Sequence, residues 1–498
     1  MILGQLCSDT MRLEYLTKVI QPLTIRGPQH LEVEGIAYDS RRVQPGYLFV
    51  ALHGRTREGT DFIRDAIQRG AVAVLSELND WTRRDVTLIR VEDARRALAE
   101  IACEFHGEPS RRLQMAGITG TNGKSTVAFM LRDILRADGR TPGLIGTVRY
   151  EIGERSIPAT RTTPEAPDIQ AMLERMLKAG CRSAVMEVSS HGLDQKRAWG
   201  IDFDVGVFTN LSQDHLDYHG TMEEYFAAKT LLFRGLGQIE KHAHAVINID
   251  DPWGMRLANT NGFTADLVTY GVHPGATVRA EEVEITADGS AFAFRSPWGD
   301  GAVRLKLLGR FNVSNALGAL AAGGALGVAP RRMAEALEAM VQVPGRLDRI
   351  PHAGGFSVFV DYAHTPDALT HVLTTLREIA PRRLIAVFGC GGNRDRGKRP
   401  LMARAATSRA DHTILTTDNP RHEDPLAILR EIAEGVAPGS SCEIIADREQ
   451  AIARAIAGAG PGDIVLIAGK GHENYQEIGD TVVPFDDREV AARLLRRR

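Results

Sequence analysis

The segment GITGTNGKST, residues 117–126, constrains the fold of this 498-residue chain more than any other feature. The apolar stretch LQMA precedes it and the amphipathic stretch STVAFMLRDILRA follows it. A strand, a glycine-rich loop, a lysine, a hydroxyl residue and a helix in this order predict a phosphate-binding loop. Loop N–H groups and the helix N-terminus would hold phosphate oxygens. We expect Lys124 to neutralise the outer phosphates and Ser125 to bind Mg²⁺.

This loop departs from the generic pattern at one position. The generic pattern has a glycine five residues before Gly123, where this chain has Ile118, and the additional glycines are Gly117 and Gly120. The loop therefore belongs to a particular subtype. The alternative, a glycine-rich turn with an exposed lysine, does not explain why a strand and a helix flank it.

The remainder of the chain alternates apolar strands, turns and helical stretches, which predicts an α/β protein. Its length suggests about three domains of roughly 150 residues each. We expect a smaller N-terminal α/β domain at 1–105, in which residues 1–10 form a poorly ordered extension. A central domain at 106–342 would hold a P-loop NTPase-like, mostly parallel sheet, and a Rossmann-like domain would occupy 343–498.

In the third predicted domain, apolar strands each end in a charged or glycine-rich cluster. The segments are FSVFVDYAH, RLIAVFGCGG, HTILTTDNPR and DIVLIAGKGHE. In open α/β sheets, ligands bind beyond the carboxyl ends of the strands. We therefore expect these clusters to share one functional edge.

Composition excludes several classes of protein. A net charge of −3 gives no reason to expect a nucleic-acid or membrane surface. No apolar run approaches the ~20 residues that span a bilayer, and the N-terminus lacks the order of a signal peptide. The cysteines are scattered without a CxxC pair, which predicts reduced thiols in a cytoplasmic protein. They are Cys7, Cys103, Cys181, Cys390 and Cys442.

A lysine on an apolar helix face is the next informative feature. Thr221 and Glu224 form a capping box that opens a helix. Lys229 then shares one face with large apolar side chains at spacings of four, three and four, namely Met222, Phe226 and Phe233. Either its ammonium reaches solvent by snorkelling, or it has a partner or is modified, because a lone buried charge is unfavourable.

Two further polar residues follow predicted strands. Glu187 ends SAVMEV, and His215 comes soon after VGVFTN in a stretch rich in Asp and His. Both could reach the nucleotide edge of the sheet. The density of acidic residues is weak support alone, because helix starts are often acidic.

Eight segments in order along the chain together resemble the Mur ligases. They are GTNGKS, MEVSSHGL, TNLSQDHLDYHG, GRFNVSNALGALA, DYAHTPDAL, CGGNRDRGKRP, DNPRHEDP and GKGHE. With YDSR at 38–41, the resemblance covers all three predicted domains. It implies a cytoplasmic, ATP-dependent amide ligase of peptidoglycan precursor synthesis that works as a monomer with Mg²⁺. Its acceptor would be UDP-N-acetylmuramoyl-L-alanyl-D-glutamate, activated as an acyl phosphate.

The resemblance also implies roles for particular residues. The UDP-linked substrate would contact Tyr38, Ser40, Thr162, Thr163, Ser189, Gln195 and Arg197, with the loop at Arg55, Thr56 and Arg57 nearby. ATP would contact Gly120, Thr121, Asn122, Gly123, Lys124, Ser125, Thr126, Asn315, Arg346, Asp361 and His364. The metal ligands would be Ser125, Glu187, His215 and Lys229, the last as an N6-carboxylysine carbamate. The catalytic set would be Lys124, Lys229, His215 and Glu187.

The tetrapeptide DNPR, Asp418–Arg421, bears on the amino acid that is added. Asn-Pro alone favours a turn at a strand end. In the family this tetrapeptide is typical of enzymes that add meso-diaminopimelate, whose distal carboxylate Arg421 can grip in a bidentate pair. Arg421 would repel the ammonium of lysine, which remains the alternative substrate. Further implied contacts are Arg394, Asp418, Asn419, Pro420, Gly469 and Glu473, with Glu473 on the distal ammonium.

Three other functions are weighed against this one. A folylpolyglutamate synthetase-like ligase would not explain YDSR or DNPR. A P-loop switch or motor would not explain candidate ligands from three domains. A non-catalytic homologue that binds the UDP-precursor would not need the intact Lys124, Ser125 and Lys229.

Overall fold

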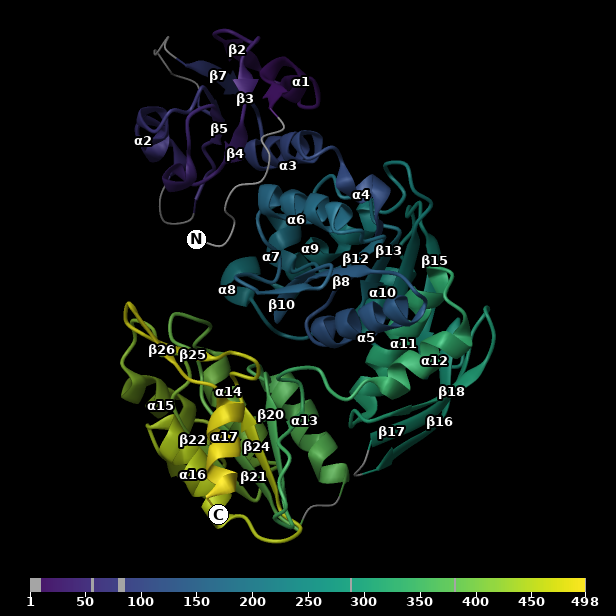
Figure 1. Cartoon of the computed structure of the whole chain (residues 1–498). Helices are drawn as coiled ribbons and strands as arrows, with labels where there is room; N and C mark the ends of the chain where they lie inside the picture. Colours follow the sequence, from purple (N-terminus) through teal and green to yellow (C-terminus); the bar gives the residue numbers. More distant parts are fainter. Residues whose placement is uncertain (1–9, 55–57, 79–85, 287–288, 380–381, 498) are drawn as a thin grey trace. The chain divides into compact units, whose positions relative to one another are not determined.

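The computed structural model describes residues 10–54, 58–78, 86–286, 289–379 and 382–497. The predictions for residues 1–9, for Cys7 and for Arg55–Arg57 lie outside these ranges. The chain divides into two compact units, and Figure 1 labels their helices and strands. The first unit comprises Met1–Gly117, Thr141–Asp204 and Arg234–Ala243, and the second comprises Ile118–Arg140, Val205–Phe233 and His244–Arg498.

The first unit begins with a mostly parallel sheet in the order β2-β7-β6-β5-β4. Alternate residues of β5 face opposite helix layers, as the two-residue period of a strand requires. Leu48 and Val50 pack with α1 and α3, whereas Phe49 packs with α2. The bounds are β2 Thr24–Arg26, β4 Gly35–Ala37, β5 Tyr47–Val50, β6 Ala73–Ser76, β7 Thr87–Arg90, α1 Leu13–Lys18, α2 Ile63–Gln68 and α3 Ala94–Phe105. A small pair, β1 Met11–Arg12 and β3 Glu32–Val33, and the 3₁₀ turns η1 Ser40–Arg42 and η2 Gly59–Phe62 complete this part.

The first unit also holds strands of the predicted central domain. Strands β9 and β12 are parallel, while β10 pairs antiparallel with both β9 and β11. The bounds are β9 Pro142–Ile145, β10 Arg149–Ile152, β11 Arg155–Pro158, β12 Ser183–Glu187, α4 Pro109–Arg112, α6 Ala166–Lys178 and α7 Ser190–Asp194.

The second unit carries the parallel series β13-β14-β15-β16, which β17 and β18 extend with antiparallel pairing. The sequence analysis did not predict the antiparallel extension, although β16 alternates charged and apolar residues, as a half-exposed antiparallel strand does. The bounds are β13 Val205–Phe208, β14 His244–Asn248, β15 Asp266–Gly271, β16 Val278–Thr286, β17 Gly289–Arg295 and β18 Gly301–Leu305. The helices are α5 Lys124–Ala137, α8 Leu216–His219, α9 Met222–Gly235, α10 Pro252–Ala258, α11 Arg310–Ala325 and α12 Pro330–Ala339.

Strand β8, Gln114–Thr119, leads into the predicted phosphate loop. It runs beside β13: Asp204 N–H donates to the Met115 carbonyl (2.9 Å), and Thr209 N–H donates to the Thr119 carbonyl (3.0 Å). The residues that follow these strands therefore meet at one edge.

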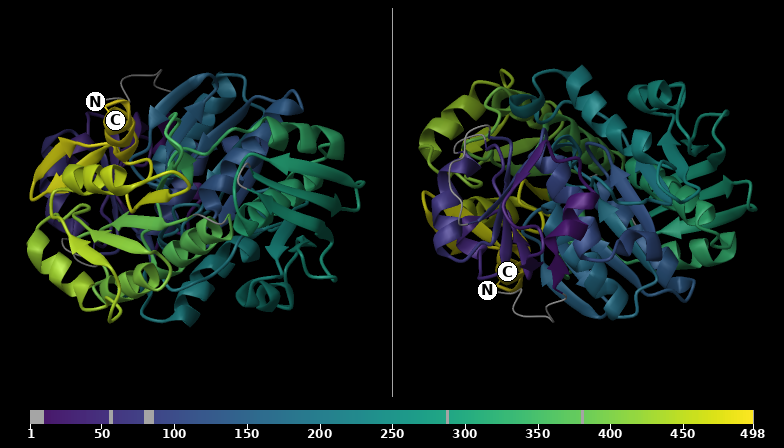
Figure 2. Two further views of the ribbon diagram at one scale, coloured as in Figure 1. Left: turned by 90° about the horizontal axis from the view of Figure 1, so that it is seen from below. Right: turned by 90° about the horizontal axis from the view of Figure 1, so that it is seen from above.

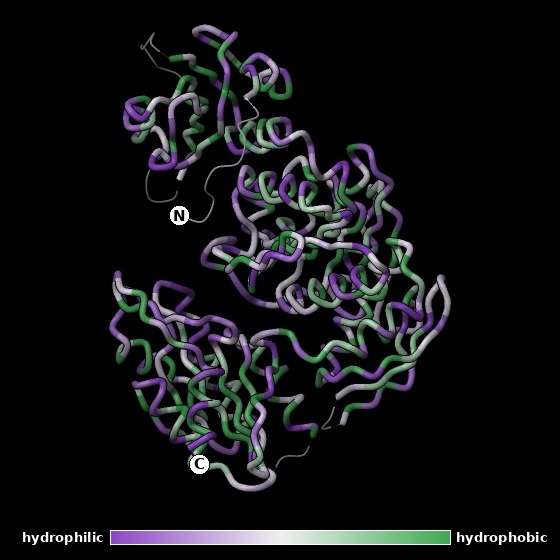
Figure 3. Tube along the Cα trace, in the orientation of Figure 1, coloured by the Kyte–Doolittle hydropathy of each residue, from purple (hydrophilic) through white to green (hydrophobic). Residues whose placement is uncertain are grey.

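The C-terminal part of the second unit is a sheet with the order β19-β20-β24-β21-β22-β23 between two helix layers (Figures 1 and 2). Neighbouring residues of β21 again face opposite layers: Phe388 packs with α13, α14 and α15, and Val387 packs with α16 and α17. Figure 3 shows the hydrophobic colour concentrated along these strands. The bounds are β19 Asp348–Arg349, β20 Ser357–Asp361, β21 Leu384–Phe388, β22 His412–Leu415, β23 Cys442–Ile444 and β24 Ile464–Ala468. The helices are α13 Pro366–Glu378, α14 Lys398–Thr407, α15 Pro425–Ala433, α16 Arg448–Gly458 and α17 Asp487–Arg496.

Strands β20, β24, β21 and β22 are all parallel. Their carboxyl ends therefore share one edge, as predicted from the clusters that follow them. A hairpin that the sequence patterns did not predict, β25 Tyr475–Ile478 and β26 Thr481–Pro484, follows β24, and Ile478 forms a bridge with Arg421.

The predicted α/β class with mostly parallel sheets is confirmed. The boundaries at 105/106 and 342/343 stay predictions. Within the described ranges, no helix has the length and apolar composition required to cross a membrane. The four described cysteines are free thiols.

Candidate active site

The phosphate loop has the geometry that its glycines predict. Gly120 has a φ of +144°, and Gly123, at the start of α5, has a φ of +85°. A Cβ on Gly120 would lie 1.9 Å from Thr209 Oγ1, and one on Gly123 would lie 2.3 Å from Asn315 Oδ1. Both positions therefore need glycine for conformation and for space, and the second places Asn315 against the loop.

Lys124 and Ser125 lie at the first turn of α5. Lys124 Nζ donates to the carbonyls of Gly120 (3.0 Å) and Thr121 (2.8 Å). The buried Ser125 Oγ accepts a hydrogen bond from Arg346 (3.2 Å). The predicted nucleotide residue Arg346 thus lies at the loop, although it is 221 positions away in sequence. Thr126 is buried in the same turn.

The tip of the loop is held from several elements. Asn122 N–H donates to Asn210 Oδ1 (2.9 Å), and its side-chain amide donates to Asp367 Oδ2 (3.1 Å) at the start of α13. The Thr121 hydroxyl lies 3.2 Å from the hydroxyl of Tyr225 on α9. The loop is therefore held by side chains from three other segments.

Lys229 is buried with its whole side chain, so the snorkelling alternative is wrong. Its residue is 1% exposed, and Nζ donates to the Gly120 carbonyl (2.8 Å) and lies 4.6 Å from the centre of the Tyr225 ring. Burial, followed by the charge of Lys124, lowers the pKa of Lys229 well below its ordinary value. The capping box is confirmed: Thr221 and Glu224 exchange backbone-to-side-chain bonds of 3.2 Å.

His215 lies near these lysines in a left-handed conformation, with a φ of +55°. Its Nε2 is 3.4 Å from Asp214 Oδ2. Burial lowers the pKa of His215 to about 4, although Asp214 acts in the opposite direction. The imidazole is therefore neutral at pH 7 and can offer a lone pair.

Asp361 and His364 follow β20. Both carboxylate oxygens of the buried Asp361 accept backbone N–H groups, from Leu347 (2.6 Å) and Ala363 (2.7 Å), and burial raises the pKa of Asp361. His364 Nδ1 lies 2.8 Å from the Tyr362 carbonyl, and burial, then Lys398, lowers the pKa of His364 to about 4. Asp361 thus fixes the turn next to Arg346.

In the first unit, Glu187 ends β12 and is fully buried. Its two oxygens accept from Thr147, one from the N–H (2.8 Å) and one from the hydroxyl (2.9 Å). The Thr162 hydroxyl is 3.0 Å from that of Thr147. A Cβ on Gly146 would lie 2.4 Å from Glu187 Oε1, so glycine leaves space for this carboxylate.

The other predicted substrate residues of the central domain form one network with it. Thr163 Oγ1 donates to the Glu187 carbonyl (3.0 Å) and accepts from Ser189 N–H (2.9 Å). Arg197 donates to the Thr163 carbonyl (2.9 Å) and to Gln195 Oε1 (2.6 Å). The structure thus brings together five predicted residues and Glu187.

Tyr38 and Ser40 lie in the N-terminal sheet region of the first unit. The Tyr38 hydroxyl donates to Asp168 Oδ2 on α6 (2.6 Å), and Arg42 pairs with Asp168 Oδ1 (3.0 Å). Burial and the Asp168 carboxylate raise the pKa of Tyr38. Ser40 is buried, and its hydrogen bond lowers the pKa of Asp65.

The residues predicted to bind the added amino acid gather at the carboxyl edge of the C-terminal sheet. Fully buried Lys470 donates to Asn419 Oδ1 (3.0 Å) and to Glu473 Oε2 (3.2 Å). Asn419 also donates to Glu473 Oε2 (2.9 Å). Burial, then Asp418, raises the pKa of Glu473. A Cβ on Gly469 would lie 2.6 Å from Asp418 Oδ2, so this strand end also needs glycine.

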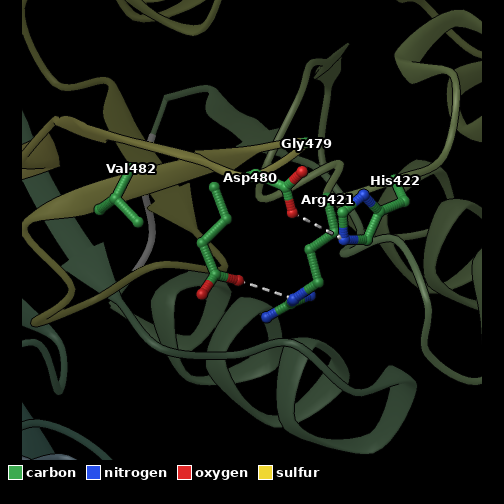
Figure 4. Close-up of a pocket in the computed structure, with 6 residues that line it drawn as sticks. Arg421, His422, Gly479, Asp480 and Val482 are labelled. Carbon is green, nitrogen blue, oxygen red and sulfur yellow. Dashed lines mark ion pairs between the residues drawn. The ribbon is translucent and has the colours of Figure 1, made fainter.

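Arg421 lines a cavity of about 240 Å³ with His422, Glu477, Gly479, Asp480 and Val482 (Figure 4). It donates from Nη1 to the Gly392 carbonyl (3.0 Å) and pairs through Nε with Glu477 (2.7 Å). Pro420 precedes it in the turn, and Arg394 lies exposed beside the same loop. Arg421 is therefore available to an anion in an open pocket.

Three family models match the chain in order. They describe the Mur ligase family catalytic domain at 32–106, the Mur ligase middle domain at 118–323 and the Mur ligase glutamate ligase domain at 345–471. The UDP-N-acetylmuramoyl-L-alanyl-D-glutamate–2,6-diaminopimelate ligase of Geobacillus thermodenitrificans is 46% identical over 492 residues, which cover 98% of this chain and 100% of that relative.

The chain belongs to the Mur ligase family.

Solved structures agree with this assignment. A UDP-N-acetylmuramoyl-L-alanyl-D-glutamate–2,6-diaminopimelate ligase is 35% identical to this Mur ligase with a TM-score of 0.70, over 98% of this chain and 99% of that one. A Mycobacterium tuberculosis folylpolyglutamate synthase complexed with ADP and AMPPCP has a TM-score of 0.62 at 22% identity, over 74% of this chain and 91% of that one. The second likeness extends to the fold alone.

Sequence reasoning missed several residues of this Mur ligase. Thr147, Asp168 and Lys470 each bind a predicted residue directly. Lys470 stands in the quoted motif GKGHE, so the buried partner of Glu473 was present in the pattern. Thr147 and Asp168 carried no comparable signal, because a threonine after a strand and an aspartate early in a helix are common.

Proposed function

We propose that this Mur ligase joins meso-2,6-diaminopimelate to the D-glutamate of UDP-N-acetylmuramoyl-L-alanyl-D-glutamate and converts ATP to ADP and phosphate. The reaction belongs to peptidoglycan precursor synthesis. The observation that carries the choice of amine is Arg421, which stands in DNPR with its guanidinium at an open cavity. The relative from Geobacillus bears the name of this reaction.

The phosphate loop binds ATP in this proposal. Gly120, Thr121, Asn122, Gly123, Lys124, Ser125 and Thr126 surround the phosphates, with contacts from Asn315, Arg346, Asp361 and His364. Arg346 already reaches Ser125 across 221 positions. The D-glutamate carboxylate attacks the γ-phosphate and becomes an acyl phosphate, while Lys124 offsets the charge of the transferring group. The amine of diaminopimelate then displaces phosphate and forms the amide.

The donor atoms of the predicted metal ligands fit Mg²⁺. The Ser125 hydroxyl and the Glu187 carboxylate are oxygen donors, and His215 is neutral at pH 7. Burial and the charge of Lys124 lower the pKa of Lys229 and so favour its unprotonated amine, the form that CO₂ converts to a carbamate, a further oxygen donor. Ser125, Glu187, His215 and carbamylated Lys229 would hold the metal. Bound Mg²⁺ would offset phosphate charge during transfer.

The UDP-linked substrate occupies the first-unit residues. Tyr38 and Ser40 serve the uridine end, and the network of Thr162, Thr163, Ser189, Gln195 and Arg197 serves the muramoyl peptide. This network supplies hydroxyl, amide and guanidinium groups, which suit carboxylates and peptide carbonyls.

The amine binds among Arg394, Asp418, Asn419, Pro420, Arg421, Gly469 and Glu473. Arg421 receives the distal carboxylate, and Glu473 contributes negative charge for the distal ammonium. Positioning of the three substrates supplies much of the rate.

The proposal includes a monomer in the cytoplasm with three domains at 1–105, 106–342 and 343–498. No nucleic acid and no membrane insertion take part.

A substrate panel tests the function. Phosphate release from ATP is measured with the UDP-linked dipeptide and either meso-diaminopimelate or L-lysine. We expect release that depends on diaminopimelate, and amide product by mass spectrometry. Release without dependence on any amine would refute the ligase, and preference for lysine would refute the choice of amine.

A further inference from the structure

The hairpin formed by β25 and β26 builds one wall of the amino-acid cavity. It is bonded to Asp418, Asn419 and Arg421 of the DNPR tetrapeptide. The bonds are Gln476 Nε2 to the Asp418 carbonyl (2.9 Å), Glu477 N–H to Asn419 Oδ1 (3.1 Å), Arg421 N–H to the Glu477 carbonyl (2.9 Å) and Gly479 N–H to the Arg421 carbonyl (2.7 Å). The hairpin therefore fixes the backbone from which the Arg421 side chain projects.

These bonds hold Arg421 in an unusual conformation. Its φ is +51°, in the left-handed region that non-glycine residues seldom adopt. Such a conformation persists where the surroundings enforce it, and it is often found at functional sites. Figure 4 shows the Arg421 side chain among the residues that line the cavity.

The guanidinium is anchored at two of its three nitrogens. Nη1 donates to the Gly392 carbonyl (3.0 Å), and Nε lies 2.7 Å from Glu477 Oε2. A Cβ on Gly391 would lie 2.9 Å from Nη1, so this glycine leaves room for the group. Among the described residues, Nη2 has no protein partner.

We propose that Glu477 is a positioning residue for amino-acid specificity, which fixes the Arg421 guanidinium so that its remaining N–H groups receive the distal carboxylate of the diamino diacid. This inference rests on the proposed function and deepens it. An arginine side chain has several rotatable bonds, and an ion pair made beforehand reduces the ordering needed when substrate binds. Glu477 also offsets the charge of Arg421 within the cavity.

A different role for Glu477 is direct contact with the distal ammonium. The structure favours positioning, because the Glu477 carboxylate is engaged with Arg421, and both side chains are part-buried, at 32% and 23% exposed. The two roles differ in which substrate groups they affect, so substrates that lack one group separate them.

The experiment compares Glu477→Gln with the matched control Asp480→Asn. Asp480 lines the same cavity from the same hairpin, but its side chain is 99% exposed and its partner is His422, at 3.7 Å. Both substitutions remove one negative charge. The amines are meso-diaminopimelate and 2-aminopimelate, which keeps the distal carboxylate and lacks the distal ammonium.

Positioning predicts that Glu477→Gln raises KM for both amines by the same factor, about 5- to 30-fold, as expected for a lost charged contact. The kcat and the KM for ATP should stay within about twofold of wild type. Asp480→Asn should raise the KM for the amines less than Glu477→Gln does, because exposed charges contribute little. A rise for diaminopimelate alone would show direct ammonium binding and overturn the proposal. Equal KM values in both variants would overturn it as well.

The wild-type enzyme distinguishes a failure of the proposed function from a failure of the inference about Glu477. If wild type releases no phosphate with diaminopimelate, the function fails, and a crystal structure of Glu477→Gln still decides the inference. An Arg421 guanidinium that leaves the Gly392 carbonyl supports positioning. A guanidinium that keeps this bond and its place overturns it.

Discussion

The phosphate loop and the amino-acid pocket both lie at carboxyl ends of parallel strands in the second unit, but they are assembled differently. The loop comes from one stretch of ten residues, 117–126, whose glycines and first helical turn make the site. The pocket draws on separate segments, from Gly392 to the hairpin at 475–484. The loop takes its shape from local backbone geometry, and distant residues such as Arg346 are added around it. The pocket exists only through contacts between distant segments.

This difference has a functional consequence. In the proposed reaction all chemistry on ATP passes through the loop, so loss of the loop should affect every substrate. In the same proposal the pocket selects one substrate, so loss of the pocket should affect one KM. Five predictions test this contrast, in order of decreasing expected effect.

Lys124→Ala should lower kcat by about 10³-fold or more, because charge on the transferring phosphoryl group loses its partner. Phosphate release with all three substrates measures this. Lys306→Ala, an exposed lysine just after β18, serves as the charge-matched control. Retention of more than about a tenth of the activity would remove Lys124 from the transition state.

Lys229→Ala should lower activity by at least about 100-fold, with partial rescue by a short added carboxylate, because the carbamate would be missing. Full activity without rescue would contradict a carbamate.

Lys229→Met should also raise the unfolding midpoint at pH 7. Because the pKa of Lys229 is lowered in the fold, the unfolded chain binds a proton that the folded chain does not. Wild-type stability is therefore reduced as pH falls below about 10.5, the ordinary lysine pKa. Thermal unfolding in CO₂-depleted buffer at pH 7 and 9.5 should show a smaller advantage of Lys229→Met at the higher pH. An advantage that grows with pH would contradict the buried neutral amine.

Arg421→Ala should raise KM for diaminopimelate by about 10- to 100-fold and leave KM for ATP unchanged, because a charge-assisted contact to one substrate is lost. Initial rates at varied amine and varied ATP measure both constants. Arg430→Ala, whose side chain is 75% exposed on α15, is the control. Equal losses for amine and ATP would show that Arg421 is structural and would erase the contrast between the two regions.

The smallest effect concerns His364, which follows β20. With its pKa lowered to about 4 by burial, the imidazole stays neutral while the unfolded chain titrates near its ordinary value of about 6.5. Its contribution to stability is complete above pH 6.5 and is lost as pH falls towards 4. His364→Gln should therefore lose less of its unfolding midpoint than wild type between pH 7 and 5. Histidine NMR titration gives the pKa directly, and a midpoint near 6.5 would refute the shift.

How far the sequence predicted each region follows from the range of the interactions. The capping box was readable because Thr221 and Glu224 lie close in the sequence. The loop glycines were readable because a positive φ is a local property of the backbone. The helical period placed Lys229 on the correct face of its helix. It could not show that this face packs against the phosphate loop, where Lys229 donates to the Gly120 carbonyl. Its burial came from a contact 109 positions away, which no local pattern encodes.

The amino-acid pocket shows the same limit more strongly. DNPR and GKGHE were recognisable as segments, and the resemblance to Mur ligases supplied their roles. The contact of the β25–β26 hairpin with Arg421 was not predicted. The two strands are short, and their mixture of polar and apolar residues has no clear strand period.

The sequence alone determined the α/β class, the phosphate loop and the family, because glycine conformations, helix caps and strand periods are set by neighbouring residues. Only the tertiary structure decided that Lys229 is buried, that Tyr38 binds Asp168 and that Glu477 holds Arg421. These pairings form when sheets and helices pack, since packing sets which distant side chains meet and which charges leave water.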